Sequence, residues 1–247
     1  MNSYVSGDIL KIKRFRVYVV SKLIEILEYL FFARKVDKKL RNINLDLVID
    51  VGANLGQTIN IIKRVNPKCK VIAFEPNKKL YHALVGKFDD DPTIKVENLG
   101  VSSNSGELAF HENVFHATST FEDINFNSSY VKKKAAILGC SPQEMFPKTY
   151  NVPVVSLYEY FEINNISHVD LIKIDVEGHE FECLVGLFKY ENKIAKRIQI
   201  ENHKNDMYLK GRDFSEYISL LSSHGYEYEF EIKHSFGDFS DIFFLRK

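Results

Sequence analysis

The 247-residue sequence predicts an α/β fold: a mostly parallel, seven-stranded sheet completed by an antiparallel C-terminal hairpin and preceded by an N-terminal helix. Short apolar runs rich in β-branched residues alternate with segments that carry apolar residues at helical spacing. A glycine-containing turn joins the first run to the first helical segment, and two strand-like segments end the chain. With 45% hydrophobic residues, the chain can bury a large core.

Residues 47–51 are the first predicted strand, which we expect at the centre of the sheet because it is apolar on both faces except at one acid. Gly52 and Gly56 then bracket a tight turn, where we expect the backbone to approach a ligand with no Cβ in the way. Residues 57–65 carry apolar side chains at helical spacing. Strand, glycine turn and helix in this order predict a nucleotide-binding site.

A second predicted strand, residues 70–74, ends at Glu75, where an acid can accept both ribose hydroxyls of an adenosine. A pyrophosphate is disfavoured, because Asn54 replaces the middle glycine of the dinucleotide fingerprint and Asp50 adds a negative charge. Asp50 instead suits the ammonium of a methionine moiety, and the helix start behind Gly56 suits its carboxylate. The turn therefore resembles the S-adenosylmethionine site of class I methyltransferases.

The third predicted strand spans residues 93–99, and residues 98–102 lie at its carboxyl end. In residues 106–111, apolar and polar side chains alternate, as in one strand of a short hairpin. Because ligands of open α/β sheets bind outside the carboxyl ends of the strands, we expect residues 98–102 near the cofactor.

Residues 112–152 show no clean strand pattern, and structureless stretches of that length are uncommon unless they are functional. We expect short helices at 130–138 and 141–146. The stretch is either a mobile polar insertion or part of an acceptor pocket. The hydroxyls and rings suited to such a pocket are Phe115, Thr118, Ser119, Thr120, Phe121 and Phe126.

A second chemical stretch begins with residues 170–174, the fourth predicted strand, and leads into a helix that starts near Phe181. Residues 197–201 are the fifth strand and end at the same edge. Ionisable groups crowded at strand ends shift one another's pKa values and mark candidate active sites. The candidate catalytic residues are Lys173, Asp175, Glu177, His179, Glu201 and His203.

The end of the chain predicts a helix over residues 214–223, closed by Gly225, and a hairpin of residues 226–232 and 240–245. An antiparallel pair that completes a parallel sheet is the methyltransferase pattern.

The N-terminal segment, residues 1–42, is basic and precedes a predicted domain of residues 43–247. Residues 1–41 hold ten Lys and Arg against four acids, so the remainder carries the balancing negative charge of a chain with zero net charge. Residues 20–31 have apolar positions at helical spacing, but charges interrupt them, so we expect an amphipathic helix that does not span a membrane. It is expected to pack on the domain or on its twin in a homodimer; a substrate lid and a peripheral membrane contact are the alternatives.

The three cysteines, Cys69, Cys140 and Cys183, are odd in number and far apart, which argues against a disulfide framework or a structural zinc site. This cysteine usage fits a reducing, cytoplasmic setting best. Peripheral membrane contact of a cytoplasmic protein is an additional possibility that we expect from the N-terminal segment. No nucleic-acid-binding module is recognisable, so nucleic acid is not an expected partner.

Five segments together resemble the FkbM family of S-adenosylmethionine-dependent methyltransferases, over roughly residues 45–245. They are residues 50–57, 74–76, 98–102, 119–121 and, most specifically, 171–180. The resemblance implies a Rossmann-like class I fold and O-methylation of a sugar or polyketide-type hydroxyl, so that a small-molecule or glycan acceptor is the expected partner. The candidate cofactor-binding residues are Asp50, Gly52, Ala53, Asn54, Gly56, Gln57, Glu75, Pro76, Gly100, Val101 and Asp175.

Methyl transfer requires the acceptor oxygen to be held in line and its proton to be removed. His179 is the first candidate base because its ordinary pKa is near neutral, while Asp175 and Glu177 could take the proton or orient the imidazole. Alternatively, a divalent cation held by Asp175, Glu201 and His203 could acidify the hydroxyl. Two other classes remain open: a nicotinamide-dependent oxidoreductase or epimerase, although the third glycine and a Tyr-x-x-x-Lys pair are missing, and a catalytically silent binding module.

Overall fold

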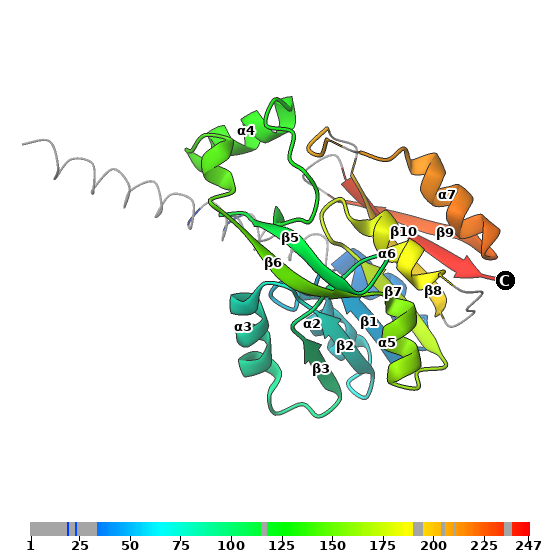
Figure 1. The fold of residues 1–247 in the computed structure, drawn as a ribbon. Helices are drawn as coiled ribbons and strands as arrows, with labels where there is room; N and C mark the ends of the chain where they lie inside the picture. Colours follow the sequence, from blue (N-terminus) through cyan, green and yellow to red (C-terminus); the bar gives the residue numbers. More distant parts are fainter. Residues whose placement is uncertain are drawn as a thin grey trace, which may run out of the picture.

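The computed structural model describes residues 34–114, 118–189, 195–203, 206–209, 211–234 and 239–247, together with residues 19 and 23. A seven-stranded sheet of order β3-β2-β1-β7-β8-β10-β9 crosses the molecule (Figure 1). All neighbours up to β8 are parallel, and β10 is antiparallel to β8 and β9, as predicted. The strands are β1 Leu47–Val51, β2 Lys70–Phe74, β3 Ile94–Glu97, β7 Val169–Ile174, β8 Ala195–His203, β9 Tyr226–Lys233 and β10 Phe239–Arg246.

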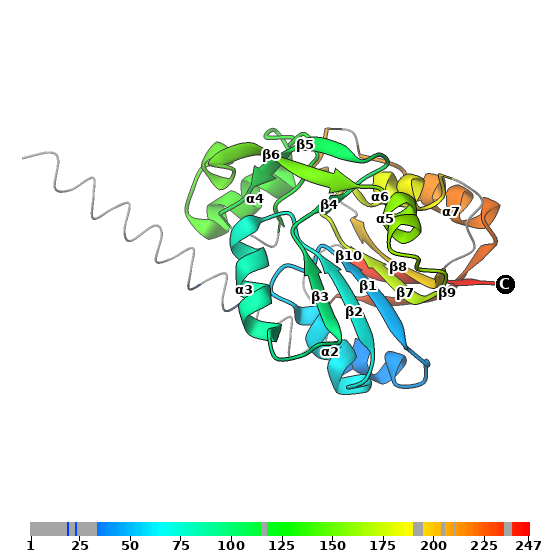
Figure 2. The same ribbon diagram turned by 60° about the horizontal axis from the view of Figure 1, so that its bottom comes forward.

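Two hydrophobic cores flank the sheet because its side chains alternate between the faces. In β1, Val48 packs in one core, and Ile49 and Val51 pack in the other. Helices lie on both faces (Figure 2). Helices α2 Gln57–Val65 and α3 Lys78–Phe88 contribute to the Val48 core, and α5 Leu157–Ile163, α6 Glu180–Leu187 and α7 Phe214–Ser223 to the Ile49 core.

A second, three-stranded sheet departs from the prediction. Its order is β4-β6-β5, formed by β4 Gly100–Val101, β5 Gly106–Glu112 and β6 Lys148–Val155. The arm predicted at residues 106–111 therefore pairs with a strand that begins inside the stretch expected to lack strands. Pro153 interrupts the strand-like sequence pattern of β6. Strand β4 pairs with Val154 and Val155 but does not reach Pro153. That side of β6 is therefore an edge at Pro153, where proline is tolerated.

The stretch between β5 and β6 is not a polar loop, because much of it packs around a small core of its own. Helix α4 Ser129–Leu138 confirms one predicted helix, and Ser128 caps it by accepting from two backbone N–H groups. The second predicted helix is only a 3-10 turn, η2 Gln143–Met145. Buried residues of both elements pack with residues that follow β8, namely Val131, Ala135, Leu138 and Met145 with Met207 and Tyr208.

The predicted N-terminal amphipathic helix lies outside the described residues, apart from residue 23. Residues 34–40 are helical, and Val36 and Leu40 are buried in the core that also contains Val48. Within the described part of the chain, no helix has both the length and the apolarity needed to cross a bilayer. All three cysteines are free thiols, and Cys69 and Cys183 are buried.

Candidate functional site

The parallel strands bring the chemical residues to one edge of the sheet. Register pairs Asp50 of β1 with Lys173 of β7, and the neighbouring Val51 with Ile174. Because parallel strands end at the same edge, the turns after β1, β2 and β7 lie together there. The carboxyl end of β8 brings Glu201 to this edge as well.

Packing requires glycine at positions 52 and 56, and the approach of a ligand to this turn stays a prediction. Gly52 has φ +84°, and a Cβ on it would lie 1.9 Å from the carbonyl oxygen of Asp175. Gly56 has φ +77°, and a Cβ there would meet the Phe88 ring at 2.7 Å. The backbone N–H groups of Gly52 and Ala53 both donate to the Phe74 carbonyl at 3.0 Å. The turn is therefore locked between β2 and β7.

Asp50 is a fully buried carboxylate on the face of the sheet that α2 covers. Neither of its oxygens has a hydrogen-bond partner among the described residues. The Lys173 ammonium lies 3.8 Å from Asp50 Oδ1. Burial raises the pKa of Asp50 to about 6, and the nearby Lys173 charge opposes that rise. Near neutral pH, Asp50 is therefore an ionised group with little hydrogen bonding, which favours a cationic partner.

Glu75 is buried at the tip of β2, and two backbone N–H groups hold it. Its Oε2 accepts from Asn54 N and its Oε1 from Asn77 N, both at 2.8 Å. Burial raises the pKa of Glu75 to about 7 in spite of these two bonds. Asn98 Nδ2 donates to the Pro76 carbonyl at 3.2 Å and fixes the turn that follows. Each carboxylate oxygen keeps further acceptor capacity, so the ribose prediction for Glu75 stays chemically sound.

Other predicted cofactor contacts fall in different surroundings. Gly100 and Val101 follow the carboxyl end of β3, as expected, but they are buried in β4 of the second sheet. A Cβ on Gly100 would lie 2.5 Å from the Phe121 ring. Gln57 is half-buried at the first position of α2. Packing thus accounts for Gly100 and Val101, while their contact with a cofactor stays a prediction.

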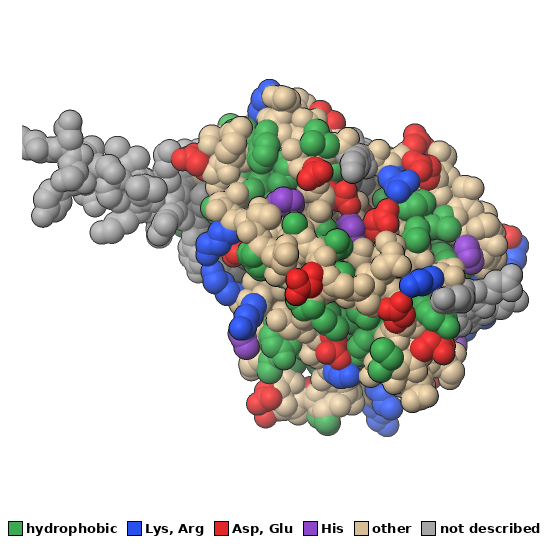
Figure 3. All heavy atoms as spheres, viewed as in Figure 1, with side chains coloured by type: hydrophobic (Ala, Val, Ile, Leu, Met, Phe, Trp, Pro, Cys, Tyr) green, Lys and Arg blue, Asp and Glu red, His purple; other side chains and the backbone are tan. Residues whose placement is uncertain are grey.

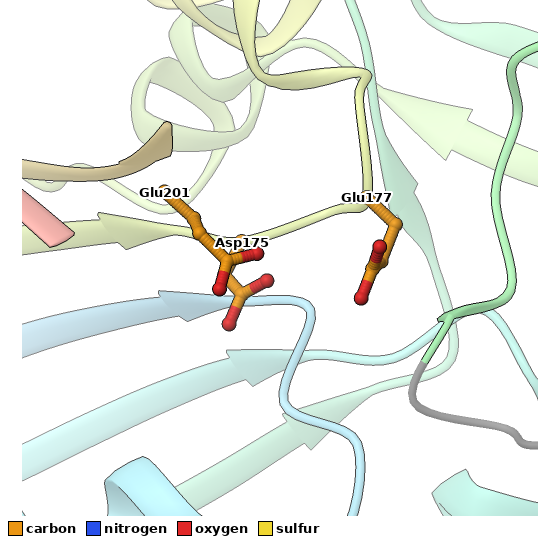
Figure 4. A group of neighbouring side chains, drawn as sticks. All are labelled: Asp175, Glu177 and Glu201. Atoms are coloured by element: carbon orange, nitrogen blue, oxygen red, sulfur yellow. The ribbon is translucent and has the colours of Figure 1, made fainter. Parts of the chain in front are cut away.

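Three carboxylates gather at this edge: Asp175 and Glu177 follow β7, and Glu201 lies near the end of β8 (Figure 4). Ligand oxygens of Asp175, Glu177 and Glu201 lie within 4.8 Å of one another. Asp175 Oδ2 also accepts from Lys173 Nζ at 2.9 Å. Desolvation lowers the pKa of Lys173, but the carboxylate charges around it outweigh this effect and hold the pKa well above its usual value. Of the predicted metal ligands, the structure groups Asp175 and Glu201; the side chain of His203 lies outside the described part of the chain.

His179 is held on both sides and is nearly buried. Its Nε2 lies 2.9 Å from Ser102 Oγ and its Nδ1 lies 2.6 Å from Glu122 Oε1. The Phe121 ring is tilted against the imidazole, with ring centres 5.2 Å apart. The arrangement orients the imidazole and places a carboxylate behind it, as in acid–base sites where a third group holds the base.

The loop between β7 and α6 is held in a strained shape. Glu177 has φ +56°, a region that non-glycine residues seldom occupy. Thr120 Oγ1 donates to its carbonyl at 2.7 Å and Tyr208 OH donates to its Oε2 at 3.1 Å. Glu180 Oε1 accepts from the N–H groups of Val176 and Gly178. Thr120 was expected to line an acceptor pocket, but it is buried and supports this loop.

The partners Glu122 and Tyr208 were not identified from the sequence. Glu122 is 57 residues from His179, and Tyr208 is 31 residues from Glu177. Neither lies in a periodic element, so no local pattern marks them. A buried network beside Glu201 was also missed, because its members lie on or next to strands that are far apart in the sequence. Asp241 of β10 accepts from Gln199 Nε2 of β8 at 2.7 Å and lies 2.7 Å from His234 Nε2.

Comparison with known proteins adds to this geometry. Residues 50–228 match the family described as "Methyltransferase FkbM domain". The hexuronic acid methyltransferase AglP of Haloferax volcanii is 29% identical over 143 residues, 58% of this chain and 50% of that protein. The 31-O-demethyl-FK506 methyltransferase FkbM of Streptomyces tacrolimicus is 24% identical over 197 residues, 73% of this chain and 72% of the relative. The chain thus spans only half the length of AglP.

A solved structure, TrmK of M. capricolum in complex with S-adenosylhomocysteine, is 11% identical with a TM-score of 0.50, over 87% of this chain and 68% of that chain. At this identity the likeness concerns the fold alone. Together with the observed strand order, it identifies the class I methyltransferase fold. The matched family also favours methyl transfer over the nicotinamide-dependent alternative.

Proposed function

Because the chain belongs to the methyltransferase family defined by the FkbM domain, we propose that it transfers a methyl group from S-adenosylmethionine to a hydroxyl oxygen of a sugar or natural product. The names of two relatives support this acceptor class: one acts on a hexuronic acid, and the other on a 31-O-demethyl compound.

The cofactor assignment rests above all on Asp50. It is a buried acid at the end of β1 whose oxygens have no hydrogen-bond partner within the described ranges. We assign it to the ammonium of the methionine moiety, and Glu75, one strand away, to the ribose hydroxyls. S-adenosylmethionine supplies a methyl group on a sulfonium sulfur, and the chain has to hold the acceptor oxygen in line with it and take up the proton.

We assign the proton to His179. Glu122 beside Nδ1 fixes the tautomer in which Nε2 carries the lone pair, and in this tautomer Ser102 Oγ donates to Nε2. An acceptor hydroxyl that replaces Ser102 at Nε2 would meet an oriented base with a carboxylate behind it. Glu177, held by Tyr208 in a strained loop, is the competing base.

The test is a mass-shift screen with purified protein, isotope-labelled S-adenosylmethionine and a panel of hexuronic acids, lipid-linked sugars and polyketide alcohols. We expect a labelled methyl ether on at least one acceptor. Cofactor binding without transfer to any hydroxyl acceptor, combined with transfer to an amine or carbon acceptor, would reject the O-methyl class.

The base is tested with His179→Ala in the same assay. We expect unchanged cofactor affinity, turnover lower by about 10²-fold or more, and a flattened acid limb of the pH–rate profile. A chelator should then have little effect on the wild type. If chelation abolishes activity and Mg²⁺ or Mn²⁺ restores it, the carboxylates in Figure 4 hold a cation and the imidazole assignment fails.

A further inference from the structure

A hollow lined by lysines lies between the helix of residues 34–40 and the end of β9. It encloses about 470 Å³, and its lining residues are Lys35, Lys38, Lys39, Asn42, Glu231, Ile232 and Lys233. Four lysines and a single glutamate thus line the hollow. Throughout the described ranges, no ion pair neutralises any of these four lysines. The chain has zero net charge, so the four lysines form a local excess of positive charge. On the face drawn in Figure 3, by contrast, side chains of both signs are interspersed.

Contacts with the protein hold two of these ammonium groups at the wall. Lys35 Nζ donates to the Lys233 carbonyl at 3.2 Å, and Lys39 Nζ lies 4.9 Å from the centre of the Phe230 ring. The helix that carries Lys35 and Lys39 is itself fixed, because Val36 and Leu40 are buried beneath it. Like charges held close together repel one another, and an anion between them would offset that repulsion.

The hollow lies at the same edge of the sheet as the candidate active site. Strand β9 runs parallel to β8, since both are antiparallel to β10. Its last residue, Lys233, pairs with Ser240, and Ser240 pairs with Asn202, which follows Glu201. Two strand spacings of about 4.8 Å place Lys233 roughly 10 Å from Asn202 along this edge. An anionic group in the hollow and a hydroxyl near Glu201 could therefore belong to one acceptor.

We propose that this hollow is a binding site for a phosphate group. Lysine binds phosphate as a point charge, and the volume is within the range that small-ligand sites occupy. A soluble phosphorylated acceptor and an anionic lipid headgroup present the same chemistry to the four lysines. The site goes beyond methyl transfer and does not depend on it, since it requires neither the cofactor nor the carboxylates after β7.

Calorimetric titration of the full-length protein with pyrophosphate, at low ionic strength and without metal ions, tests the site. The variant combines Lys35→Gln, Lys39→Gln and Lys233→Gln. The matched control combines Lys68→Gln, Lys132→Gln and Lys133→Gln, which remove the same charge from exposed positions elsewhere. Both variants are first compared with the wild type by thermal unfolding. We expect the hollow variant to bind about tenfold more weakly or worse, and the control to bind within about twofold of the wild type.

Sedimentation with phosphatidylcholine vesicles, with and without phosphatidylglycerol, then distinguishes a lipid headgroup from a soluble phosphate as the ligand. Loss of sedimentation on the anionic vesicles in the hollow variant alone supports a lipid headgroup. Unchanged sedimentation together with weakened pyrophosphate binding supports a soluble phosphate. No pyrophosphate binding by the wild type, or an equal loss in both variants, overturns the proposal. Cofactor binding and methyl transfer are not measured here, so this result is independent of the proposed function.

Discussion

Replacing Asp50 by asparagine should make the protein more stable and weaken its binding of the cofactor. Burial raises the pKa of Asp50 from its ordinary 3.8 to about 6. At about 1.4 kcal/mol per pKa unit, the ionised carboxylate lowers the free energy of unfolding by about 3 kcal/mol at neutral pH. Asparagine has nearly the same shape and no charge, so Asp50→Asn should recover most of this amount above pH 6.

The direction of this pH dependence follows from whether the folded or the unfolded chain holds the Asp50 proton more tightly. Between about pH 4 and pH 6 the folded chain keeps the Asp50 proton while the unfolded chain loses it, so the wild-type contribution declines as pH rises through this window. The asparagine variant lacks that decline, so the two proteins should differ little near pH 4 and most above pH 6.

Cofactor affinity should move in the opposite direction. A charged hydrogen bond is worth about 1.5–3 kcal/mol, so binding of S-adenosylhomocysteine, which carries the same ammonium on its homocysteine moiety, should weaken by roughly 10- to 100-fold. Urea unfolding at pH 4.5 and 7.5 and calorimetry at pH 7.5 measure the two effects. Asp46→Asn is the matched control: Asp46 is exposed just before the same strand, and its replacement should change neither quantity. Lower stability of Asp50→Asn at pH 7.5, or unchanged affinity, would refute the reasoning.

Three other substitutions test the site. Gly52→Ala should lower the free energy of unfolding by about 3 kcal/mol or more, because its Cβ would lie 1.9 Å from a backbone oxygen. Gly86 has open space around it, so Gly86→Ala should leave the free energy of urea unfolding unchanged or raise it by about 0.5–1 kcal/mol. Tyr208→Phe removes the donor to Glu177 and should lower the unfolding free energy by about 1.5–3 kcal/mol; an unchanged value would show that the bond contributes nothing. Glu75→Gln should weaken S-adenosylhomocysteine binding about tenfold or more by calorimetry, and equal affinity would exclude its ribose role.

The role proposed for Asp50 accounts for a destabilising residue at this position. A cation-binding acid inside a closed edge of a sheet has to be desolvated before the ligand arrives, so the folded chain carries the cost and binding offsets it. Lys173 limits this cost by its position 3.8 Å away, without a hydrogen bond that would occupy the carboxylate.

Local sequence patterns were enough to predict the main sheet. Hydrophobic runs with β-branched residues predicted β1, β2, β7 and β8, and the order of strand, glycine turn and helix predicted the cofactor edge, because these signals depend on neighbours close in the chain. The family resemblance, confirmed by the match over residues 50–228, rested on the same local segments. Candidate acids at strand ends could be named because parallel strands must bring their carboxyl ends to one edge.

What those side chains contact depends on how distant elements pack together. The pairing of β5 with β6 and of His179 with Glu122 joins residues separated by intervening segments whose own sequence patterns say nothing about the partner. Gly52 must be glycine because a Cβ would meet the Asp175 carbonyl, which follows β7 and is remote from Gly52 in the sequence. Local periodicity encodes which face of an element is apolar, but the contacts of a polar side chain depend on which elements pack together, and the whole chain sets that.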